Sequence, residues 1–71
     1  MHDHENLLHN IGNKIRIYRN IHGVSQQELA DNADIAKSTV QRIEKGELNP
    51  TIILLKKISK AMNIDICNLI S

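Results

Sequence analysis

Hydrogen-bonding side chains are gathered at helical spacing in the segment from Ala36 to Lys45. If this segment is a helix, Ala36, Val40 and Ile43 share one face, and the opposite face is polar. The polar residues are Ser38, Gln41, Arg42 and Lys45, with Lys37 at the exposed first turn. Such groups can pair with base edges in a DNA major groove, and the guanidinium of Arg42 fits O6 and N7 of guanine. The competing interpretation is an ordinary solvated helix face.

Residue patterns for other chemistry are weak. The N-terminal segment 2–5 reads His-Asp-His-Glu, with His9 beyond it, and such groups can bind transition metals. No Cys-x-x-Cys or His-Glu-x-x-His spacing accompanies them. Cys67 is the only cysteine, and neither a nucleophile with a neighbouring base nor a glycine-rich phosphate loop is evident. We therefore expect a protein that is not an enzyme and that has no metal site and no cofactor.

Composition predicts one small helical domain. The chain has 71 residues, 41% of them apolar, and Tyr18 is its only aromatic residue, so the core must be aliphatic. Its longest apolar run, from Ile52 to Leu55, is far short of the roughly 20 residues that span a bilayer. No secretion leader is recognisable, and we expect a cytoplasmic protein that does not contact membranes. The net charge is only +1, so any nucleic-acid binding must depend on how the basic residues are distributed.

Apolar spacing predicts a first helix that ends near Gly23. The residues that recur every three or four positions are Leu7, Leu8, Ile11, Ile15, Tyr18 and Ile21. Gly23 suits the left-handed residue that follows a helix end. Ser25 then caps a second helix, Glu28 completes a capping box, and Val24 packs on Leu29.

Three more helices follow in short succession. The second helix stops near Asp34, and the third occupies the polar-faced segment described above. Asn49 or Thr51 caps a fourth helix that extends through Met62, and Asp65 caps a short fifth helix. We therefore predict an all-α fold of five helices.

The connection between the second and third helices is the most informative feature of this fold. It contains only about three residues, and the small residue Ala30 lies where two steeply crossing helices would touch. Two helices arranged in this way leave the outer face of the third helix free to enter a DNA major groove. Residues 1–6 are expected to form a flexible N-terminal tail, and residues 7–71 a single domain.

The sequence resembles the Cro/repressor-type (XRE-like) helix-turn-helix regulators over roughly residues 11–70. The matching positions are Ile11-Gly12, Ile15-Arg16, Arg19, Gly23, Ser25-Gln26, Glu28-Leu29-Ala30, Ser38-Thr39-Val40, Ile43-Glu44-Lys45-Gly46 and Asn49-Pro50. The resemblance implies a five-helix lambda-repressor-like domain that binds double-stranded DNA, with its third helix in the major groove and the start of its second helix on the backbone.

Site residues follow from the resemblance by position. It implies that the base contacts come from Lys37, Ser38, Gln41 and Arg42. It implies phosphate contacts from Gln26, Thr39 and Lys45, with Thr39 also able to contact a base. A partly buried ion pair between Arg19 and Glu44 is expected to be structural.

Two positions depart from the family pattern. Asp34 stands where glycine is usual in the turn, although aspartate tolerates a left-handed backbone better than most residues. Ala36 stands where a serine or threonine cap is expected, and the missing cap is expected to cost about 1 kcal/mol. Both departures lie in the connection that precedes the third helix.

Apolar residues outside the inward stripes predict self-association. The family commonly dimerises through its fourth and fifth helices, and the interface residues predicted here are Ile53, Leu54, Ile66 and Ile70. We expect a homodimeric transcriptional repressor or controller on a pseudo-palindromic operator, with a toxin or another regulatory protein as a possible further partner. The alternative is a protein-interaction module or antitoxin-like protein that retains the fold.

Overall fold

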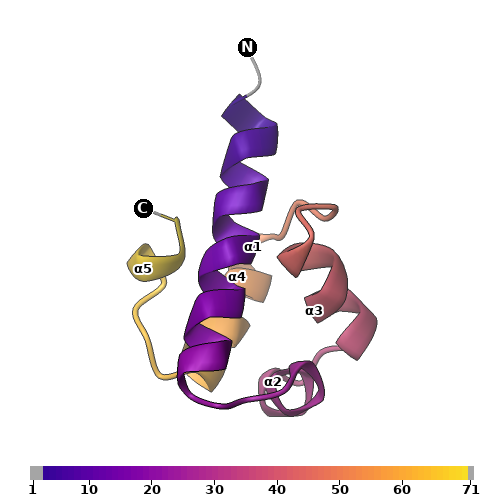
Figure 1. Cartoon of the computed structure of the whole chain (residues 1–71), viewed down its shortest axis with the longest axis vertical. Helices are drawn as coiled ribbons and strands as arrows, with labels where there is room; N and C mark the ends of the chain where they lie inside the picture. The colour runs from indigo at the N-terminus through magenta and orange to yellow at the C-terminus, as the bar shows by residue number, and fades with distance from the viewer. Residues whose placement is uncertain (1–2, 71) are drawn as a thin grey trace.

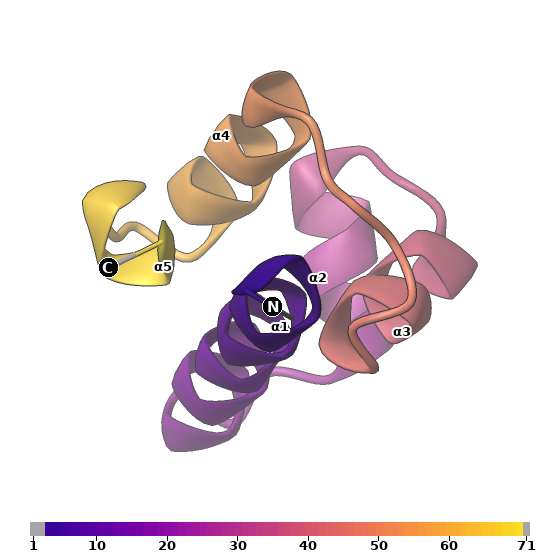
Figure 2. The same cartoon turned by 90° about the horizontal axis from the view of Figure 1, so that it is seen from above.

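The computed structural model describes residues 3–70 and contains five helices in that range. They are α1 (Asp3–Ile21), α2 (Gln26–Ala33), α3 (Lys37–Glu44), α4 (Ile52–Ala61) and α5 (Cys67–Ile70). Helix α1 is the long axis of the molecule, with α2 and α3 on one side and α5 on the other (Figure 1). Seen along α1, helix α4 closes the bundle between α2 and α5 (Figure 2). The predicted all-α, five-helix fold is confirmed.

Helix α1 starts earlier than its apolar spacing predicts. It begins at Asp3, so residues 3–6 of the predicted tail are helical, and the predicted domain boundary at residue 7 stays a prediction. Residues 1 and 2 of the predicted tail, and the last residue of the predicted domain, lie outside the described residues. Ile11 and Ile15 are buried as expected, but Ile21 is 69% exposed and does not join the core, because the chain leaves the helix there.

The N-terminus of α2 has the predicted capping box. Ser25 Oγ accepts a hydrogen bond from the Glu28 amide at 3.0 Å, and the Ser25 amide donates to Glu28 Oε1 at 3.0 Å. The bond from the Ser25 amide stabilises the ionised carboxylate and is the main cause of a lowered pKa for Glu28. Val24 packs against the core cluster that contains Leu29, as expected of the residue before the cap.

A tight turn of residues 34–36 joins α2 to α3. Asp34 adopts the left-handed conformation with φ of 58°, and its amide donates to the carbonyl oxygens of Ala30 and Asp31. Ala36 is the N-cap of α3 and makes no side-chain capping bond, as its side chain dictates. It is also exposed, so the prediction that Ala36 belongs to the inner face of the third helix is wrong.

The last two helices have the expected kinds of cap. Thr51 Oγ1 accepts from the Leu54 amide at 3.0 Å, which selects Thr51 over Asn49 as the cap of α4. Asp65 Oδ1 accepts from the Cys67 amide at 3.1 Å at the start of α5. This backbone bond is the main cause of a lowered pKa for Asp65. No helix in the described range is both long and apolar enough to cross a membrane.

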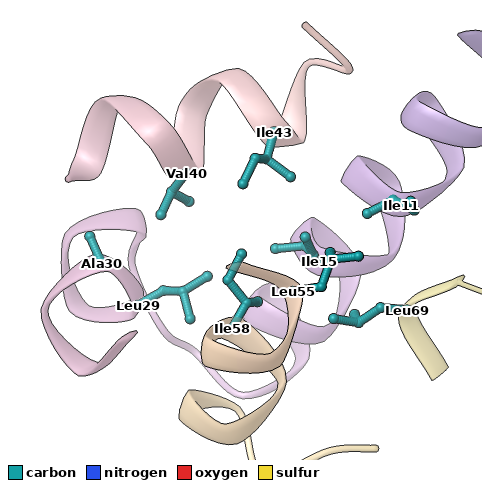
Figure 3. Packing of buried hydrophobic residues seen from close by; sticks show 9 residues of the cluster. All are labelled: Ile11, Ile15, Leu29, Ala30, Val40, Ile43, Leu55, Ile58 and Leu69. Atoms are coloured by element: carbon teal, nitrogen blue, oxygen red, sulfur yellow. The ribbon is translucent and has the colours of Figure 1, made fainter. Parts of the chain in front are cut away.

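All five helices contribute to one aliphatic core (Figure 3). Its buried members are Ile11, Ile15, Leu29, Ala30, Val40, Ile43, Leu55, Ile58 and Leu69. Ala30 is fully buried where α2 packs against α3, as its small size predicts. Gly12 is buried where α1 approaches α3, and a Cβ there would lie 2.8 Å from the carbonyl oxygen of Glu44. The core therefore fixes α3 against α1 and α2 at once.

Candidate nucleic-acid interface

Helix α3 has an apolar inner face and a polar outer face. Val40 and Ile43 are each 1% exposed and point from α3 into the core cluster (Figure 3). The exposed polar residues of this helix and its C-cap are Lys37, Ser38, Arg42 and Lys45. Thr39 and Gln41 are half-buried on the two flanks. The structure therefore brings the residues with predicted base contacts together on one helix, with Gln41 less accessible than the others.

The outer face of α3 is basic and unengaged. Within residues 3–70, the side chains of Lys37, Ser38, Arg42 and Lys45 make no hydrogen bond or ion pair to the rest of the chain. Ser38, Arg42 and Lys45 are separated by four and three residues, so they follow one stripe along the helix. Free donors on such a basic stripe can donate hydrogen bonds to phosphates and to base edges. In Figure 2, α3 lies on the side of the bundle away from α5.

Arg19 and Glu44 form the predicted ion pair between α1 and α3. Arg19 Nε donates to Glu44 Oε2 at 2.8 Å and Nη2 donates to Oε1 at 3.1 Å, which makes a bidentate pair. The two side chains are 14% and 5% exposed. The hydrogen bond to Glu44 is the main cause of a raised pKa for Arg19. Arg19 Nη1 also donates to the Val24 carbonyl oxygen at 2.9 Å, which ties the start of α2 to the pair.

Gln26, the first residue of α2, is half-buried and takes part in the same cluster. Its Nε2 donates to Glu44 Oε1 at 3.1 Å. Sequence reasoning assigned Gln26 to a phosphate and did not anticipate this bond, because nothing in a local pattern relates residue 26 to residue 44. The predicted phosphate contact stays a prediction, and Gln26 has one further amide hydrogen with which to make it.

The predicted dimer residues differ in accessibility. Ile53 is 71% exposed and Ile70 is 43% exposed, so both can contact a second protein. Leu54 and Ile66 are half-buried and pack partly against the chain's own core. Sequence analysis missed Ile52, which is 68% exposed beside Ile53 at the start of α4. Three large exposed isoleucines therefore lie on α4 and α5.

The described residues contain no candidate metal site. No group of three or more histidine, cysteine, aspartate or glutamate residues in that range could hold a metal ion. His2 of the N-terminal pattern lies outside the described residues. Cys67 is exposed and free at the start of α5.

Comparison with known proteins identifies the class. A sequence model described as helix-turn-helix matches residues 15–69, which extend from the second half of α1 into α5. The chain belongs to the helix-turn-helix family of DNA-binding transcriptional regulators, of the Cro/repressor type that its motifs resemble.

Individual relatives agree with this membership. The chain is 35% identical over 54 residues to an uncharacterized HTH-type transcriptional regulator of Methanocaldococcus jannaschii, with 76% of this chain and 82% of the relative covered. It is 38% identical over 61 residues to the HTH-type transcriptional regulator SinR of Bacillus subtilis. That match covers 84% of this chain but only 55% of SinR. The crystal structure of the restriction-modification controller protein C.AhdI from Aeromonas hydrophila superimposes with a TM-score of 0.86 at 29% identity. That match covers 87% of this chain and 94% of the controller.

Proposed function

We propose that the chain is a sequence-specific regulator that inserts α3 into the major groove of double-stranded DNA and acts as a homodimer on a pseudo-palindromic operator. The observation that carries this proposal is the uncovered basic face of α3, whose opposite face is locked into the core by Val40 and Ile43. A rigid helix of this kind can present donors to base edges at fixed positions.

Base recognition is assigned to the exposed side chains of α3. Arg42 can donate two hydrogen bonds to one guanine, and Lys37 and Ser38 lie in the first turn, where recognition helices commonly meet bases. Gln41 is half-buried and is a secondary candidate because less of its amide is accessible.

Phosphate binding is assigned to the residues that frame α3. Lys45 is exposed at the C-cap of α3, and Gln26 is the first residue of α2, where unpaired amides and the helix dipole favour an anion. Thr39 is half-buried on one flank of α3 and can donate its hydroxyl to a phosphate or a base. These contacts would fix the register of α3 without carrying sequence information.

Dimerisation is assigned to the exposed isoleucines of α4 and α5, chiefly Ile53 and Ile70. Leu54 and Ile66 would border this surface while also supporting the core. Burying isolated large apolar side chains between two copies removes them from water. A twofold dimer would hold two α3 helices about 34–36 Å apart, one turn of DNA. A toxin or another regulatory protein that covers the same surface would be one route of control.

Selection of bound duplexes from a random library tests the DNA-binding proposal. We expect enrichment of an inverted repeat whose half-sites are about one helical turn apart. No enrichment at low salt would contradict the proposal and favour a protein-interaction module that retains the fold.

Sedimentation equilibrium at micromolar concentration tests the dimer separately. We expect a dimer for the wild-type chain and a monomer for Ile53→Asp, because a carboxylate at the interface would lose its hydration. Ile21→Asp, on the exposed end of α1, is the matched control and should leave the dimer intact. A strictly monomeric wild-type chain, with and without DNA, would contradict the dimer but not the binding of DNA.

A further inference from the structure

The carboxylate of Glu44 is a junction between three helices. It accepts hydrogen bonds from Arg19 Nε, Arg19 Nη2 and Gln26 Nε2, at 2.8, 3.1 and 3.1 Å. Glu44 is the last residue of α3, Gln26 is the first residue of α2, and Arg19 lies in the last turn of α1. One side chain that is 5% exposed therefore links the end of the candidate recognition helix to the start of the preceding helix.

Gln26 has enough hydrogen-bond donors to bind Glu44 and a ligand at the same time. A glutamine amide carries two N–H donors, and Glu44 takes one of them. The donors leave the same nitrogen in a fixed planar geometry, so fixing one direction fixes the other. Gln26 is half-buried, so its side chain retains contact with solvent. The second N–H can therefore be offered to an acceptor outside the protein without rearrangement of the side chain.

The charge of the junction also favours an anion nearby. An isolated carboxylate at the end of α3 would repel a phosphate that approached Gln26. Arg19 forms a bidentate pair with that carboxylate, and its guanidinium is always positively charged. The pair is neutral overall, so it can orient Gln26 without opposing DNA.

We infer that Glu44 is a positioning residue for DNA binding, which holds the Gln26 amide in the orientation that donates to a backbone phosphate. The inference depends on the proposed function. Part of the DNA affinity that Gln26 contributes then comes from its preformed bond to Glu44. An amide that is already held in place loses less conformational freedom when DNA binds. Arg19 supports this arrangement from α1.

A comparison of two matched backgrounds tests the inference. Both contain Arg19→Met, because the positive charge of Arg19 would have no partner once Glu44 is replaced by a neutral residue. One adds Glu44→Met, which removes the acceptor for Gln26, and the other adds Glu44→Gln, which restores a neutral oxygen acceptor. Replacing an ion pair by apolar residues of similar size is often tolerated by the fold. Thermal unfolding would establish that each protein is folded at the temperature of the binding assay.

The readout is the affinity of each protein for a random-sequence duplex at one low salt concentration, before and after Gln26→Ala. We expect Gln26→Ala to weaken binding about tenfold in the wild-type chain and in the Glu44→Gln background, because a charge-assisted bond to phosphate is lost. In the Glu44→Met background, the same substitution should change affinity by less than about twofold, because the amide is no longer preorganised. Equal losses in both backgrounds would overturn the inference.

The outcomes separate this inference from the proposed function. A wild-type chain that fails to bind the duplex overturns both, whereas binding that is insensitive to Gln26→Ala overturns only the inference. If the Glu44→Met background does not fold, NMR relaxation of the side-chain amides in the free wild-type protein decides. The Gln26 amide should have a higher order parameter than that of Gln41, which is also half-buried and lies on α3. Equal order parameters would overturn the inference.

Discussion

Gly12 of α1 meets the end of α3 at the backbone of Glu44. A Cβ atom at position 12 would lie 2.8 Å from the Glu44 carbonyl oxygen, closer than non-bonded atoms approach, and it would also collide with the carbonyl oxygen of Ile43. Glycine therefore permits a helix contact in which two backbones touch. This contact places the Glu44 side chain within reach of Arg19 and so supports the ion pair.

Gly12→Ala should destabilise the protein. The added methyl group meets rigid backbone rather than a flexible side chain, so α1 and α3 must separate, at a cost of about 1–3 kcal/mol. This cost exceeds the gain of up to about 1 kcal/mol from the better helix propensity of alanine. Urea unfolding would measure the change, with the exposed α1 position Asn10→Ala as the control. A Gly12→Ala variant more stable than wild type would contradict the close packing.

Ala36→Ser should stabilise α3. Ala36 already has the extended conformation of an N-cap, with φ of −74° and ψ of 145°, but offers no acceptor to the amides of the first turn. A serine hydroxyl would supply one, as Ser25 does for α2, with a gain of about 1 kcal/mol. Thermal unfolding would measure it. Lys57→Ser, at an exposed position within α4, is the control and should show a small loss instead, and an equal effect at both positions would argue against the cap.

The Glu28 capping box should make stability depend on pH. Its hydrogen bonds lower the pKa of Glu28 from an ordinary value of 4.5, so the folded state favours the ionised form. The resulting stabilisation is present above pH 4.5 and is lost as the pH falls through the lower, folded-state pKa. The stability advantage of the wild-type chain over Glu28→Gln should therefore shrink on acidification.

Urea unfolding at neutral pH and at a pH well below 4.5 would check this expectation. Glu47→Gln is the control, because Glu47 is an exposed carboxylate beyond the end of α3 and outside any capping box. An advantage over Glu28→Gln that stays constant with pH would show that the ionised form is not favoured by the fold.

Features encoded locally could be predicted from the sequence. The capping box at Ser25, the left-handed Asp34 and the helical periodicity of Val40 and Ile43 each depend on residues a few positions apart, and the structure confirms them. Pairing of Arg19 with Glu44 spans 25 positions and was expected only through the family resemblance. The fold was therefore predictable from short-range patterns together with that resemblance.

Features that arise only from packing were not predictable. The early start of α1 at Asp3 has no strong capping signal, and Ile21 fits the apolar stripe although the chain turns away before it can be buried. The contact of Gly12 with α3 and the bond from Gln26 to Glu44 depend on where separate helices meet. No local pattern contains that information.

The central claim is that α3 reads base sequence, and one comparison tests it most directly. The affinities of the wild-type chain and of Arg42→Ala would be measured for the selected operator and for a scrambled duplex at several salt concentrations. Lys45→Ala serves as the matched control, because Lys45 is also exposed and is assigned to a phosphate.

We predict that Arg42→Ala lowers the ratio of operator to scrambled affinity by about tenfold, because a bidentate contact to guanine is lost. Lys45→Ala should instead weaken both complexes alike and flatten the dependence of log affinity on log salt by about one counterion. An Arg42→Ala variant that keeps the wild-type ratio of affinities would contradict base recognition by this residue of α3.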